Sequence, residues 1–190
     1  MVLYMPHLRR NFSTALISAS VILTAGCSTS TDTEPVAATS TTTAAADVPA
    51  GSVRLGGAVE NPITLAADDL LGYPRLTQAV TFDSSKGSQT HTYEGAALTD
   101  LLAAAVLDGD PDAKNPDLTF AILATGSDDY QATVSWGEVA TDFGATQALV
   151  AYTEDGQRLD APRLVVPGDI KGGRYVSDLT ELDVVDLREK

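Results

Sequence analysis

The sequence predicts a folded domain that contains both strands and helices, with short strands outnumbering the helices. Short apolar runs rich in branched residues recur along the chain between turn residues, and such runs are typical of strands. One stretch instead repeats its apolar residues with the period of an amphipathic helix. At 190 residues the chain has room for one such domain and a tail.

Residues 1–26 are predicted to be a lipoprotein signal peptide. A short basic segment precedes Phe12–Gly26, which is mostly apolar, uncharged and too short to span a bilayer comfortably. The small residues before Cys27 resemble a bacterial lipobox, with Thr24 in place of the usual leucine. Cleavage there would leave a lipidated Cys27, so we expect attachment to the cell membrane on its extracytoplasmic side. An ordinary secretory signal with a free cysteine is the alternative.

Residues 27–52 are predicted to be a disordered tether. Rich in Ser, Thr and Ala, this segment cannot bury enough apolar surface to offset the entropy lost on ordering. The folded domain is expected at 53–190. Because Cys27 is the only cysteine in the chain, that domain has no thiol for a disulfide, a nucleophile or a metal ligand. The formal net charge of -14 argues against a nucleic-acid partner, which would need a basic surface.

The first half of the domain has signals for two helices and a hairpin. A helix is predicted at Leu65–Leu71, because a threonine suited to an N-cap precedes it and Gly-Tyr-Pro follows it. Leu76–Phe82 and Gln89–Glu94 are the predicted strands of a hairpin with a serine-rich, glycine-containing turn. The apolar residues of Leu98–Val106 recur at helical spacing and predict an amphipathic helix.

The second half of the domain is predicted to be mostly strands. These strands are expected at Leu118–Ala124, Tyr130–Trp136, Ala148–Tyr152, Arg163–Val166 and Leu182–Val184. An Asp-Gly pair after the third of them is typical of a hairpin turn. A Pro-Gly pair after the fourth forces another change of direction.

No metal site is predicted from the sequence. Asp108–Asp112 invites comparison with a calcium loop, but Ala113 and Thr119 stand where an EF-hand needs glycine and glutamate. A solvated acidic turn is therefore predicted. His91 is the only histidine of the expected domain, so no histidine cluster can bind zinc. We expect His91 to share one strand face with Tyr93.

Lys171-Gly172-Gly173-Arg174 is the candidate ligand-binding loop. Glycines allow a backbone to approach a ligand closely. The flanking cations suit an anionic group such as a phosphate. The same pattern is also typical of a solvated loop, and that interpretation stays open at this point.

Four motifs occur in a recognisable order: Val53–Val59, Tyr93–Leu102, Ser127–Tyr130 and RLVVPGDIKGGRYVSDLTELDV at Arg163–Val184. Together they resemble the sulfite-oxidase-type molybdopterin-binding domain family. The resemblance implies an α+β fold with a mixed, largely β core and short helices. It also implies a site for a molybdopterin cofactor.

One departure from that family bears on activity. In its catalytic members a Cys thiolate binds molybdenum, and here Ser84 or Ser85 occupies the corresponding place. The candidate cofactor-binding residues are therefore Lys171, Gly172, Gly173, Arg174, Ser84 and Ser85. We expect a non-catalytic binding or accessory module for a pterin or another small anionic ligand, with an envelope protein as a further candidate partner.

Two alternatives to a non-catalytic module stay open. The first is a molybdopterin-dependent oxidoreductase that holds the cofactor without a protein thiolate. Serine can ligate molybdenum in a different enzyme family, so the missing cysteine does not by itself remove this alternative. The second is a purely protein-binding module.

Overall fold

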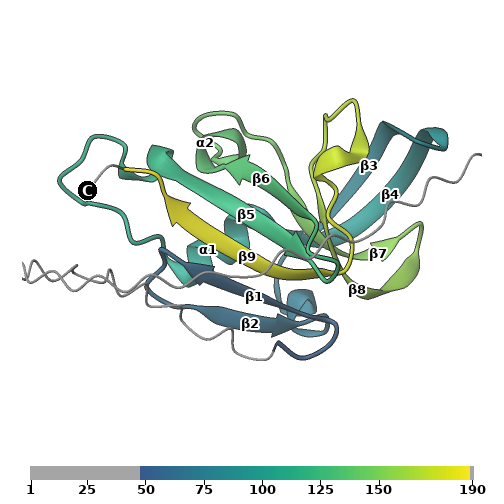
Figure 1. Cartoon of the computed structure of the whole chain (residues 1–190), viewed down its shortest axis with the longest axis horizontal. Coiled ribbons are helices and arrows are strands. Elements are labelled where there is room, and N and C mark those ends of the chain that lie inside the picture. The colour runs from purple at the N-terminus through teal and green to yellow at the C-terminus, as the bar shows by residue number, and fades with distance from the viewer. Residues whose placement is uncertain (1–47, 189–190) are drawn as a thin grey trace, which may run out of the picture. The chain divides into compact units, whose positions relative to one another are not determined.

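A computed structural model describes residues 48–188, which form a five-stranded and a four-stranded β-sheet with short helices between the strands. The predicted α+β class with a largely β core is therefore confirmed (Figure 1). The predicted signal peptide, Cys27 and most of the predicted tether lie outside the described residues.

The five-stranded sheet contains the first and the last strand of the domain side by side. In spatial order its strands are β2 (Ile63–Ala66), β1 (Ser52–Gly57), β9 (Leu179–Asp186), β5 (Phe120–Gly126) and β6 (Gln131–Ser135). β1 and β9 pair in parallel, whereas the other neighbours are antiparallel. Gly57, where β1 ends, has φ +85°, and a Cβ there would lie 2.2 Å from the carbonyl oxygen of Val184. Only glycine lets β1 end so close to β9.

The four-stranded sheet consists of two antiparallel hairpins. Its strands are β3 (Arg75–Ser84), β4 (Gly87–Ala97), β7 (Leu149–Glu154) and β8 (Gln157–Val165). Both predicted hairpins are confirmed, since β3 pairs with β4 and β7 pairs with β8. The β7–β8 turn is Asp155-Gly156, with positive φ at both residues, as such a turn requires. β4 and β7 are neighbours, which places the β7–β8 turn beside β4.

One continuous hydrophobic core joins the two sheets and the longer helix. The predicted amphipathic helix is α1 (Leu98–Ala105), and its four regularly spaced apolar residues are all buried. The remaining helices are single turns: η1 (Asp69–Gly72), η2 (Pro116–Thr119), α2 (Trp136–Val139) and η3 (Gly172–Arg174). Large buried side chains such as Tyr93, Phe120 and Leu182 fill the centre.

The predicted helix at Leu65–Leu71 is wrong. Residues 63–66 form β2 instead, in which Leu65 is paired with Val53 of β1. The Ala66 N–H donates to the Asp69 carboxylate at 2.8 Å, and the chain turns into η1 rather than a full helix. Pairing with β1 satisfies backbone groups that the helix would have satisfied within itself.

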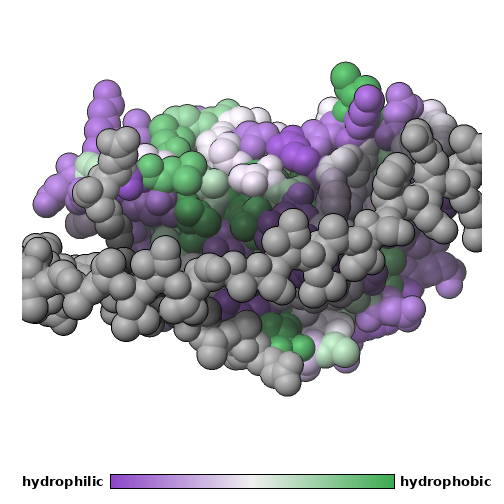
Figure 2. Space-filling model, viewed as in Figure 1, coloured by the Kyte–Doolittle hydropathy of each residue, from purple (hydrophilic) through white to green (hydrophobic). Residues whose placement is uncertain are grey.

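On the face shown in Figure 2, hydrophobic residues are visible among hydrophilic ones. Hydrophobic residues gather over α2, where Leu118, Trp136 and Phe143 line an open pocket. Among the residues that the structure describes, no helix is both long and apolar enough to cross a bilayer.

Candidate functional site

A hollow of about 490 Å³ lies between the β3–β4 turn and the loop that leads into η3. Its lining residues are Phe82, Asp83, Ser84, Ser85, Lys171, Gly172 and Gly173. The Asp83 N–H donates to the carbonyl of Ile170 at 2.8 Å, and Asp83 and Lys171 form a parallel bridge. The end of β3 therefore holds the glycine loop in place, and two segments almost ninety residues apart in sequence share one hollow.

Gly172 is the residue that lets the loop lie against β3. A Cβ at this position would lie 2.6 Å from Cδ2 of Phe82, so no larger side chain fits without movement of the ring. At Gly173 the nearest atom to such a Cβ would be the Tyr130 hydroxyl, at 4.0 Å. The two glycines thus differ, because the first is required by packing and the second has room for a methyl group.

Lys171 is the positively charged residue that lines the hollow. Its side chain is exposed and forms no ion pair with any residue between 48 and 188. Ser85 also lines the hollow. The Ser84 hydroxyl, by contrast, donates to the carbonyl of Gly87 at 3.2 Å and accepts from the Lys86 N–H at 3.1 Å. Ser84 is therefore engaged in the hairpin turn.

Arg174 does not line the hollow with Lys171. Its guanidinium donates two hydrogen bonds to the Asp169 carboxylate, at 2.6 and 2.9 Å, and one to Glu138 at 2.9 Å. Hydrogen bonding to Asp169 raises the pKa of Arg174 well above its usual range. The structure therefore brings Lys171, Gly172, Gly173, Ser84 and Ser85 together, and uses Arg174 to fasten η3 to α2.

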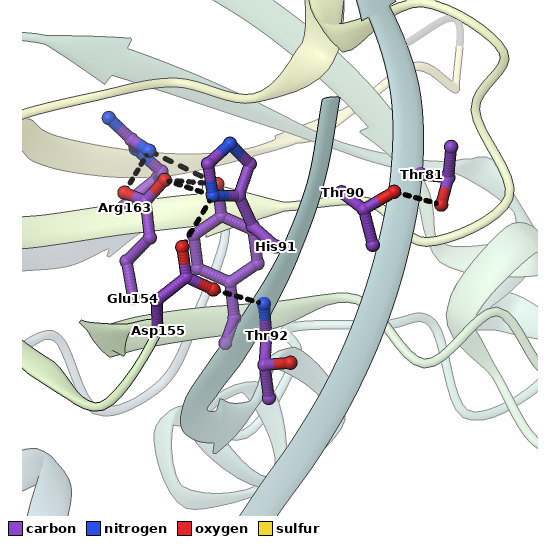
Figure 3. Close-up of polar contacts among 8 residues, drawn as sticks. Thr81, Thr90, His91, Thr92, Glu154, Asp155 and Arg163 are labelled. Carbon is purple, nitrogen blue, oxygen red and sulfur yellow. Dashed lines mark hydrogen bonds and ion pairs between the residues drawn. The ribbon is translucent and has the colours of Figure 1, made fainter. Parts of the chain in front are cut away.

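A second polar cluster, which was not predicted from the sequence, lies where the β7–β8 turn meets β4 (Figure 3). Nδ1 of His91 lies 2.8 Å from Oδ2 of Asp155 and 3.2 Å from Oε1 of Glu154. His91 shares its strand face with Tyr93, as predicted, and the two ring centroids are 6.0 Å apart. The local signal was this shared face, but the pairing of β4 with β7 could not be read from it.

The fully buried Tyr93 and the partly exposed Arg163 complete that cluster. The Tyr93 hydroxyl donates to Oε1 of Glu154 at 3.1 Å, and Arg163 donates to Oε2 of Glu154 at 2.6 Å. Burial raises the pKa of Tyr93, although its hydrogen bond from Arg163 opposes the shift. The phenol therefore stays protonated and serves as a donor to Glu154.

These features define a β-rich α+β domain with a ligand-sized hollow at a glycine loop. Residues 41–190 match the profile of the oxidoreductase molybdopterin binding domain, and the chain belongs to that family. The resemblance noted from the sequence motifs is thereby confirmed.

The fold is similar to that of a solved structure, the sulfane dehydrogenase SoxCD from Paracoccus pantotrophus. The TM-score is 0.57 at 22% sequence identity, over 71% of this chain. The matched region is 38% of the SoxCD chain, so this protein spans well under half of that neighbour's length. No curated protein matches the chain.

The residues around the hollow do not fit a molybdenum centre ligated in the manner of the family's catalytic members. Residues 48–188 contain no cysteine, so no thiolate is available. The hydroxyl of Ser84 already has two partners in the hairpin turn. Lys171 and the backbone of the glycine loop suit an anionic group such as a phosphate, and the arrangement can bind such a group without ligating a metal.

Proposed function

We propose that this chain is a membrane-anchored lipoprotein whose domain binds a small anionic ligand, such as the phosphate of a pterin, without molybdenum catalysis. The observation that carries the proposal is the hollow beside Gly172 and Gly173, in which Lys171 has no ion pair with any residue of the described range 48–188. In a chain with a net charge of -14, a cation placed next to an open hollow is a local site for an anion.

Metal analysis tests the non-catalytic part of the proposal. The chain is exported from a host that makes the molybdenum cofactor, and its molybdenum content is measured after purification. We expect none, because the residues of the hollow offer no thiolate. Near-stoichiometric molybdenum would contradict the proposal and support an oxidoreductase that holds the cofactor without a protein thiolate.

Titration with inorganic pyrophosphate tests the binding part. We expect the purified chain to bind it in calorimetry or in NMR shift mapping of the glycine loop. Lys171→Ala should weaken binding at least about tenfold, since a charge-assisted contact contributes roughly 1.5–3 kcal/mol. Lys114→Ala removes the same charge away from the hollow and should leave binding unchanged. Equal binding by both variants would contradict the proposal and favour a protein-binding module.

Membrane anchoring has a separate test. Lipidation of Cys27 predicts that the chain is found in the membrane fraction and carries acyl chains detectable by mass spectrometry. Cys27→Ser removes the only thiol and should move the chain to the soluble extracytoplasmic fraction. A wild-type chain that is soluble after export would contradict anchoring and leave the ligand-binding proposal intact.

A further inference from the structure

We propose that His91, Glu154 and Asp155 form a binding site for a divalent transition-metal ion, with Zn²⁺ as the ion that suits it. The three side chains converge where the β7–β8 turn lies against β4 (Figure 3). None of them lines the hollow beside Lys171, so this inference does not rest on the function proposed for that hollow.

The ligand atoms have the separations that a bound ion needs. Nδ1 of His91 lies 2.8 Å from Asp155 and 3.2 Å from Glu154, and the three ligand atoms lie within 4.8 Å of one another. Zinc binds nitrogen and oxygen ligands at about 2.0–2.2 Å, which puts neighbouring ligand atoms roughly 3 Å apart. An ion can therefore replace the direct contacts of His91 with only small side-chain shifts.

Asp155 is held by the backbone in an orientation that suits this role. The Thr92 N–H donates to Oδ1 of Asp155 at 2.9 Å, and the Asp155 N–H donates to the carbonyl of Thr92 at 2.7 Å. These two bonds fix the turn against β4 and leave Oδ2 directed at His91. Little conformational entropy remains to be lost when a ligand binds.

Glu154 is oriented by side chains instead. Arg163 donates to Oε2 at 2.6 Å, and the Tyr93 hydroxyl donates to Oε1 at 3.1 Å. Oε1 has a second lone pair, and it is the oxygen nearest His91. Outer donors that fix metal-binding carboxylates are a common feature of protein metal sites, and each carboxylate here has at least one.

The donor set favours a transition metal over calcium or magnesium. An imidazole nitrogen suits zinc and its neighbours, whereas calcium and magnesium prefer all-oxygen sites. Three protein ligands leave a position for water, as in zinc sites that stay open. The side chains of His91 and Glu154 are 24% and 22% exposed, and that of Asp155 is 53% exposed. The site is therefore shielded on the side of β4 and accessible to solvent at the turn.

Calorimetric titration with Zn²⁺ tests the site, using the purified chain without an added histidine tag. We expect one Zn²⁺ per chain and a higher melting temperature when Zn²⁺ is present, because binding to the folded state stabilises it. His91→Ala and Asp155→Asn should each weaken binding at least about tenfold. Asp155→Asn keeps the shape of the turn, and circular dichroism of both variants checks that they fold.

Two control variants distinguish this site from general binding to an acidic chain. Glu60→Gln removes an exposed carboxylate between β1 and β2, and Glu94→Gln removes a β4 carboxylate outside the cluster. Both should bind Zn²⁺ as the wild type does. Absence of Zn²⁺ binding by the wild type would overturn the proposal. Binding that persists undiminished in folded His91→Ala, or equal affinity for Ca²⁺, would overturn it as well.

Discussion

At the scale of one residue, Tyr175 makes two opposing contributions to the stability of the core. Its ring packs on Phe82 with centroids 4.6 Å apart, and only 9% of the residue is exposed. Its hydroxyl is buried and has no hydrogen-bond partner among residues 48–188. Burial, with the nearby charge of Asp169, raises the pKa of Tyr175 to about 12. The ring stabilises the fold, whereas the buried hydroxyl, which has no partner in the described part of the chain, opposes it.

Tyr175→Phe is therefore expected to stabilise the domain. Removing a buried hydroxyl without a partner recovers a desolvation cost, so the free energy of unfolding should rise by about 1 kcal/mol in urea titrations. Tyr93→Phe is the matched control, because the Tyr93 hydroxyl bonds to Glu154 and Arg163. That variant should lose roughly 1–3 kcal/mol. A destabilised Tyr175→Phe would show that the hydroxyl has a partner in solution.

Glu138 predicts a pH dependence of stability. Burial alone would raise its pKa, but hydrogen bonds from Ser135 and Arg174 outweigh burial and lower it. A carboxyl whose pKa is lowered by folding stabilises the fold above its ordinary pKa of 4.5, and this contribution is lost as the pH falls through the folded-state value. The Glu138–Arg174 pair should therefore stabilise the domain at neutral pH and not in acid.

Glu138→Gln tests this dependence, since glutamine can keep the cap on α2 but lacks the charge. At neutral pH the variant should be less stable by roughly 0.5–1 kcal/mol, the range for partly exposed ion pairs. Urea titrations at decreasing pH should show that the difference in stability between wild type and variant vanishes well below pH 4.5, because the wild-type carboxyl is then protonated and uncharged like the glutamine. A difference that stays constant with pH would contradict the assigned role of the charge.

At the scale of elements, η3 can lie close against β3 because Gly172 has no side chain. Gly172→Ala brings a methyl group to 2.6 Å from the Phe82 ring, so the loop or the ring must move. We expect a loss of roughly 1–3 kcal/mol in stability and weaker pyrophosphate binding. Gly173→Ala has 4.0 Å of space and should change both quantities little. Equal effects of the two variants would refute the packing argument.

Local chemistry decides which elements the sequence could predict. The two hairpins were predictable because Asp155-Gly156 and the serine-rich turn carry their own signals. The Ser135–Glu138 capping box that begins α2 also has a local signature, although α2 was not among the predicted helices. Leu65–Leu71 was predicted wrongly because capping signals compete with pairing to β1, the strand just before it in the chain. Arg174 likewise has carboxylate partners that glycine and charge patterns do not reveal.

At the scale of the whole molecule, most contacts between distant segments could not be predicted from local sequence patterns. The parallel pairing of β1 with β9 joins the two ends of the domain, and no local pattern predicts it. The cluster of His91 with Glu154 and Asp155 depends on β4 lying next to β7, about sixty residues later in the chain. By contrast, the approach of Ser85 to Lys171 could be proposed, because the family resemblance carries the long-range order of the motifs.

β9, the last strand of the domain, lies in the middle of the five-stranded sheet, so its packing should strongly affect the stability of the whole domain. Leu182 is fully buried between β1 and β5, whereas Leu187, just after the strand, is 65% exposed. Leu182→Ala should lower the free energy of unfolding by roughly 2–5 kcal/mol, because it leaves a cavity in the core. Leu187→Ala should change it by no more than about 0.5 kcal/mol.

The same variant tests whether both sheets unfold together. One continuous core joins them, so Leu182→Ala should shift circular dichroism and the fluorescence of Trp136, the only tryptophan, to the same lower urea midpoint. Coincident transitions mean that the β3–β4 and β7–β8 turns, which carry both candidate sites, depend on a strand that touches neither. If the fluorescence transition moved while the circular dichroism transition stayed in place, the two sheets would be separate folding units and that dependence would not hold.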